Sequence, residues 1–70
     1  MTTRETAMYL VIRSDSIFSR PVLGTYSTQE EALEHLRALK AQFIEEDAQN
    51  PGCYDAIGSD GRIYSIEKKD

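Results

Sequence analysis

The 70-residue sequence lacks tryptophan and contains one cysteine, one histidine and two prolines. The single cysteine, Cys53, excludes an internal disulfide, and a lone cysteine is typical of the reducing cytoplasm. The longest apolar run covers residues 7–12, far short of the ~20 residues that a membrane-spanning helix needs. The N-terminus does not match a signal peptide. We therefore expect a cytoplasmic protein without a membrane segment, folded as a single domain over residues 1–70.

The charge of the chain is unevenly distributed. Hydrophobic residues make up 40% of the sequence, which is too apolar for a disordered chain, and the formal net charge is −4. Residues 28–50 carry six acidic and two basic side chains, so the rest of the chain is neutral. This segment disfavours duplex nucleic acid, which calls for a basic surface, and it suits a basic protein partner. An acidic helix face that only keeps a small protein soluble is the simpler interpretation.

Four short segments have the character of strands. Residues 8–12 and 22–26 are rich in aliphatic and aromatic side chains and predict a first hairpin. Residues 53–57 and 62–66 predict a second one, because the turn between them contains an Asp-Gly pair. The chain ends, residues 1–6 and 67–70, are polar or charged, and we expect them to fray.

A single long helix is predicted between the two hairpins. Residues 27–31, Ser-Thr-Gln-Glu-Glu, match the capping box that starts a helix. Apolar residues then recur at helical spacing from Ala32 to Ile44, and Asn-Pro-Gly at residues 50–52 stops the helix. The predicted fold is a small two-layer α+β domain of order β-β-α-β-β. It has one mainly antiparallel four-stranded sheet with the helix on one face.

The first strand is apolar on both of its faces, although one helix covers only one face of a sheet. We predict that the side bearing Tyr9 and Val11 lies on the open face. Tyr54 and Tyr64 of the later strands would join Tyr9 there in an apolar interaction surface. In the alternative arrangement, the loop of residues 14–21 folds over that face.

No motif in the sequence points to catalysis or to a bound cofactor. His35 and Cys53 lack a third group that would orient a nucleophilic pair. Glu31 and His35 offer two metal ligands at helical spacing, whereas a metal site needs three or four. There is no glycine-rich phosphate loop. We expect a protein that is not an enzyme, with no catalytic residue, cofactor or metal.

The residues that we predict to contact a partner fall into acidic, apolar-loop and tyrosine groups. In the loop of residues 14–21, Ile17 and Phe18 lie between the charged Asp15 and Arg20, an arrangement typical of interface anchors. Packing of Phe18 into the end of the core is the alternative. The predicted partner-binding residues are Glu30, Glu34, Glu45, Glu46, Asp47, Tyr9, Ile17, Phe18, Tyr54 and Tyr64.

The run from Gly24 to Leu33, a strand that leads into a capped helix, resembles the strand-helix junction of HicB-type antitoxins. In size, acidity and lack of catalytic motifs, the chain is also similar to phage-encoded inhibitors of bacterial defence, including anti-CRISPR proteins. We predict a small acidic inhibitor or adaptor that binds and occludes a larger, basic protein. Two alternatives stay open. One is a sheet whose tyrosines stack on single-stranded nucleic acid, and the other is a structural homo-oligomer, such as a homodimer joined through the open sheet face.

Overall fold

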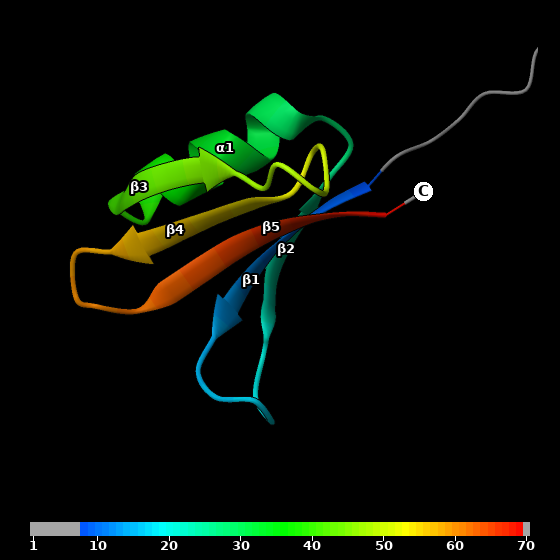
Figure 1. Ribbon diagram of the computed structural model, residues 1–70. Helices are drawn as coiled ribbons and strands as arrows, with labels where there is room; N and C mark the ends of the chain where they lie inside the picture. Colours follow the sequence, from blue (N-terminus) through cyan, green and yellow to red (C-terminus); the bar gives the residue numbers. More distant parts are fainter. Residues whose placement is uncertain (1–7, 70) are drawn as a thin grey trace, which may run out of the picture.

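The computed structural model describes residues 8–69, which form five strands and one helix (Figure 1). The elements are β1 (Met8–Ser14), β2 (Val22–Tyr26), α1 (Gln29–Ala38), β3 (Ala41–Glu46), β4 (Tyr54–Gly58) and β5 (Ile63–Lys69). The strands form one antiparallel sheet in the order β2-β1-β5-β4-β3. The predicted small α+β fold with an antiparallel sheet is confirmed, whereas the predicted number of four strands is wrong.

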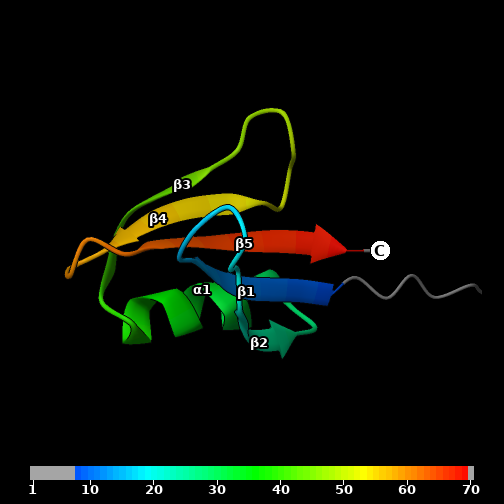
Figure 2. The same cartoon turned by 90° about the horizontal axis from the view of Figure 1, so that it is seen from below.

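The helix α1 connects the two edge strands, β2 and β3, and lies on one side of the sheet (Figures 1 and 2). We call the side that α1 packs against the covered face, and the opposite side the uncovered face. No helix among residues 8–69 is long and apolar enough to cross a membrane.

The core lies between α1 and the covered face. Val11 of β1 is directly opposite Ile66 of β5, and Leu36 of α1 belongs to the same cluster. All three side chains are fully buried. Gly24 of β2 allows the helix to come close, because a Cβ atom at this position would lie 3.0 Å from Nδ1 of His35. The covered face is therefore closely packed by a single helix.

The helix begins where the capping signature predicts. Thr28 has extended backbone angles, and its Oγ1 accepts a hydrogen bond from the backbone N–H of Glu31 at 3.2 Å. The Thr28 hydroxyl is also 3.1 Å from Oε1 of the same glutamate. The side chain of Thr28 thus satisfies one of the N–H groups that lack a partner at a helix start, and the predicted cap is confirmed.

The predicted extension of the helix beyond Ala38, through Ile44 to the stop at residues 50–52, is wrong. The helix ends at Ala38, where the N–H of Leu39 bonds to the carbonyls of the last turn and Lys40 adopts a left-handed conformation with φ 64°. A residue in this conformation ends a helix. The chain then reverses, and residues 41–46 pair with β4 as the fifth strand instead of forming another helical turn.

An irregularity in β3 explains why its strand character is hidden in the sequence. The register of β3 on β4 shifts between Gln42 and Glu45, so that Phe43 and Ile44 together face Ala56. Phe43 has φ 55°, as one residue of a β-bulge often does. The bulge turns Ile44 toward the core and leaves Phe43 exposed. It thereby breaks the alternation that would otherwise identify a strand.

Residues 67–69, which we expected to fray, continue β5 as a regular strand. Glu67 lies opposite Leu10, and Lys69 lies opposite Met8. The expected fraying of residues 1–6 and of Asp70 lies outside the described residues.

Candidate functional site

The three tyrosines that we predicted on the open face lie on the covered face, because α1 packs on their side of the sheet. Tyr64 is 5% exposed, and Tyr9 and Tyr54 pack against the same core. The Tyr54 hydroxyl accepts a hydrogen bond from Nε2 of Gln29 at 2.6 Å. Burial, with the nearby charge of Glu46, raises the pKa of Tyr54 above 10.0. The predicted placement is wrong, and with Tyr64 buried the tyrosines present no open platform for stacking bases.

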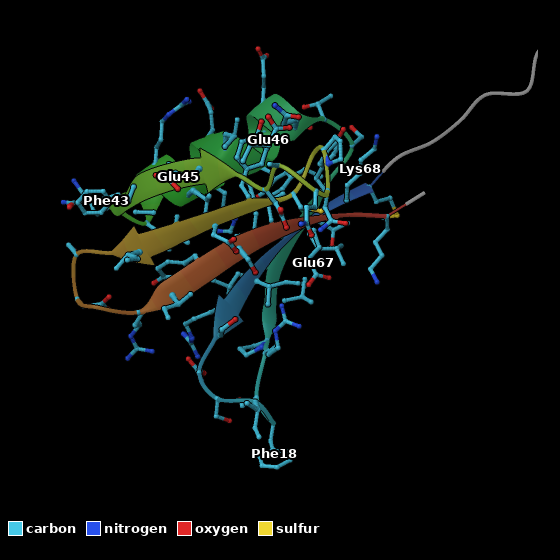
Figure 3. All side chains as sticks on the ribbon, in the orientation of Figure 1. Phe18, Phe43, Glu45, Glu46, Glu67 and Lys68 are labelled. Carbon is cyan, nitrogen blue, oxygen red and sulfur yellow. The ribbon has the colours of Figure 1, made fainter. Side chains whose placement is uncertain are left out.

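The predicted acidic helix face does not form, since its members lie on three separate elements. Glu30 and Glu34 are exposed on α1, Glu45 and Glu46 belong to β3, and Asp47 begins the loop that follows β3. Figure 3 shows Glu45 and Glu46 on β3. The negative charge is thus spread over the molecule instead of concentrated on one helix.

Glu46 and Asp47 have structural partners in the β3–β4 loop. A carboxylate oxygen of Glu46 accepts the N–H of Gly52 at 3.0 Å. The carboxylate of Asp47 accepts the N–H of Gln49 and the side-chain amide of Asn50, both at 2.9 Å. The hydrogen bonds from Asn50 and Gln49 lower the pKa of Asp47 below its ordinary 3.8. These two carboxylates therefore shape a turn.

The uncovered face carries apolar side chains on neighbouring strands. Residues directly opposite one another in an antiparallel pair share a face, so Ile12 lies beside Val22 on β2 and Ile57 of β4 lies beside Ile63 of β5. Val22, Ile57 and Ile63 are 52%, 46% and 51% exposed. No element among residues 8–69 packs over them as α1 packs over the covered face. Several exposed apolar side chains on one face of a sheet mark an interaction site more often than an isolated exposed side chain does.

A projecting arm, residues 14–21, rises at one side of this face. The hairpin of β1 and β2 continues into it through hydrogen bonds from the N–H of Arg13 to the carbonyl of Pro21 at 3.0 Å and from the N–H of Asp15 to the carbonyl of Ser19 at 2.9 Å. A two-residue turn closes the arm between Ser16 and Ser19. The arm is thus an ordered extension of the sheet (Figures 1 and 2).

The tip of the arm presents two large apolar side chains to solvent. Ile17 is 85% exposed and Phe18 is 91% exposed. Figure 3 shows Phe18 at the far end of the arm, pointing away from the sheet. The alternative in which Phe18 packs into the core is therefore wrong. The tip of the loop stands clear of the sheet, whereas Arg20 near its base bonds to Glu67 on the uncovered face. An ordered turn that exposes phenylalanine and isoleucine has the properties of an interface anchor.

The arm and the β3–β4 loop border a shallow groove of about 380 Å³ that runs across β5. Arg20 of the arm reaches over this groove and places Nη2 2.9 Å from Oε2 of Glu67. The residues that line the groove include Arg20, Asp55, Ile63, Ser65 and Glu67. Ser65 is 8% exposed, and its hydroxyl has no hydrogen-bond partner among the described residues.

The groups that the sequence offers for catalysis or metal binding are dispersed. Nδ1 of His35 is 2.8 Å from the hydroxyl of Tyr26, and Cys53 is a free, half-buried thiol in the β3–β4 loop. In the part of the chain that the structure describes, no three His, Cys, Asp or Glu side chains gather as metal ligands. Comparisons with protein-family models, curated proteins and solved structures find no match to the chain. Function is therefore inferred from the chain's own geometry.

Sequence reasoning missed the apolar and polar residues of the uncovered face. The signal was present, since alternation in residues 53–57 and 62–66 places Ile57 and Ile63 on the side opposite Tyr54 and Tyr64. The sequence did not reveal which of these two sides the helix would cover. Ile17 and Phe18, in contrast, lie together at the exposed tip, as the pattern of charged residues around them suggested.

Proposed function

We propose that the chain is a non-catalytic, cytoplasmic protein-binding domain, which acts as a small inhibitor or adaptor by occluding a larger partner. Its docking surface consists of the uncovered face and the arm. The observation that carries this proposal is the location of the exposed apolar side chains. Among residues 8–69, seven large hydrophobic side chains are exposed, and they lie on the arm, on the uncovered face or at its edges, where Phe43 of β3 borders Ile57 and Ile63. The seven are Met8, Ile17, Phe18, Val22, Phe43, Ile57 and Ile63.

The shape of this surface supports binding to a protein. The long axis of the molecule measures 47 Å against 24 and 23 Å for the others, and the arm projects from the sheet (Figure 1). A projecting anchor beside an apolar face provides the buried centre that stable interfaces need, and the acids around it supply the polar rim. The net charge of −4 would speed the approach of a basic partner.

A matched pair of substitutions tests this surface. Phe18 at the arm tip is 91% exposed, and Glu34 is exposed on α1, on the other side of the sheet. The tagged protein and its Phe18→Ser and Glu34→Gln variants would be used to capture partners from a lysate of the encoding organism. We expect a partner that the wild type and Glu34→Gln retain and that Phe18→Ser loses. A partner retained equally by all three, or lost equally by both variants, would contradict the proposed surface.

A further inference from the structure

Two carboxylates stand side by side on the uncovered face next to the groove. Glu45 of β3 is directly opposite Asp55 of β4, so both side chains project from the same face, and both are exposed. Like charges directly opposite one another destabilise a sheet. Within residues 8–69 neither carboxylate has an ion-pair partner. A cation bound between them would remove this repulsion.

Ser65 lies in the same row of residues across the sheet, and its hydroxyl group also lacks a partner. It lies on β5 directly opposite Asp55, and it lines the groove together with that aspartate. Its side chain is more than nine-tenths buried, and its Oγ makes no hydrogen bond in the described chain. Buried hydroxyl groups normally have a hydrogen-bond partner. A ligand that brings several N–H donors to Asp55 would also supply one for Ser65.

The same face provides an apolar surface beside these polar groups. Ile57 and Ile63 are directly opposite one another, two residues along their strands from Asp55 and Ser65, and each is about half exposed. Such a surface accommodates the methylene stem of a long cationic side chain whose charged end reaches the carboxylates. Arg20, whose guanidinium is bonded to Glu67 in this groove, shows that an arginine side chain can reach a carboxylate here.

We propose that this part of the uncovered face binds an arginine side chain carried by the partner protein. The guanidinium group bridges Asp55 and Glu45 and donates a hydrogen bond to Ser65, while its stem lies on Ile57 and Ile63. The planar fork of five N–H donors allows arginine to serve three acceptors at once, whereas the compact ammonium group of lysine does not match this arrangement. This inference rests on the proposed function and names the chemistry of the partner.

The test uses short peptides as probes of the groove. Uniformly ¹⁵N-labelled protein would be titrated by NMR with capped Leu-Arg-Leu, with its lysine counterpart, and with its citrulline counterpart, which keeps the shape but has no charge. We expect the arginine peptide to shift the amide signals of Asp55 and Ser65 with a Kd in about the millimolar range. The citrulline peptide should bind at least about tenfold more weakly, and salt should weaken the arginine complex.

Two charge-neutralising variants identify the groups that are responsible. Asp55→Asn keeps the shape of its side chain and should abolish the shifts, whereas Glu34→Gln on the exposed side of α1 should leave them unchanged. The NMR spectrum itself shows that each variant is folded. Equal binding of the arginine and citrulline peptides would overturn the inference. Equal loss in both variants, or no shift up to about 10 mM peptide, would also overturn it.

The outcome of partner capture separates this inference from the proposed function. If Asp55→Asn still captures the partner that Phe18→Ser loses, the arginine site is wrong and the docking surface stands. If Phe18→Ser captures the partner as well as the wild type does, the docking surface itself is wrong.

Discussion

The two faces of the sheet are built from the same strands, yet only one of them is packed against a helix. In β1, the neighbours Val11 and Ile12 are both buried, but only Val11 belongs to the cluster that α1 closes. In β5, Ile66 on the covered face is fully buried, whereas Ile63 on the other face is 51% exposed. Since one helix supplies one apolar surface, the helix covers one face of the sheet and leaves the other face open. Under the proposed function, the covered face serves stability and the uncovered face serves binding.

The largest expected difference between the faces is in the free energy of unfolding. Leu36→Ala removes a fully buried side chain of the helix–sheet core and should cost about 2–5 kcal/mol. Ile63→Ala on the uncovered face should cost less than about 1 kcal/mol, because half of that side chain is already in water. Urea denaturation of the two variants measures both values. Similar losses would mean that the uncovered face is as well packed as the covered one.

A smaller effect, of opposite sign, is expected at the end of α1. Lys40 has φ 64°, a conformation that costs a side-chain-bearing residue about 1 kcal/mol and costs glycine little. Lys40→Gly should therefore raise the urea midpoint, whereas Arg37→Gly inside the helix should lower it by a similar amount. A lower midpoint for Lys40→Gly would contradict the left-handed conformation at Lys40. It would therefore also contradict the end of α1 at this point and the placement of β3 directly after it.

The smallest effect concerns two turn carboxylates that lie in neither face. Hydrogen bonds lower the pKa of Asp47 and of Asp60 below the ordinary 3.8. The folded state therefore holds fewer protons than the unfolded state. Both groups stabilise the fold above about pH 4, and this contribution disappears as the pH falls through their folded-state pKa values. Thermal unfolding between pH 2 and pH 6, at about half-unit steps, should show a smaller acid loss in Asp47→Asn and Asp60→Asn than in the wild type. An unchanged pH profile would contradict the assignment.

The features that are predictable from this sequence are local ones. The capped start at Thr28 and the strands β1, β2, β4 and β5 follow from short-range patterns of polar and apolar residues. The fifth strand does not, because neither glycine nor asparagine marks the left-handed turn at Lys40 and a bulge disrupts alternation at Phe43. In residues 41–46, pairing with β4 prevails over a helical spacing that the sequence also satisfies.

The proposed docking surface was less predictable than the fold for a related reason. Alternation shows that Tyr64 and Ile63 lie on opposite faces, but it does not show which face α1 covers. Which face α1 covers depends on tertiary packing. Gly24 contributes, because the absence of a side chain there allows the helix to come close to the sheet. The arm tip was easier to identify, since Ile17 and Phe18 lie in a short turn between charged residues with no apolar partner nearby in the sequence.

The proposed function requires that the isolated chain leaves its uncovered face open for a different protein. The molar mass of the purified chain, determined by light scattering at low and at high salt, tests this claim most directly. We expect 7.9 kDa under both conditions, because the face remains exposed in the isolated protein. A dimer that persists at high salt would contradict it, since the apolar face would then be buried against a second copy of the chain.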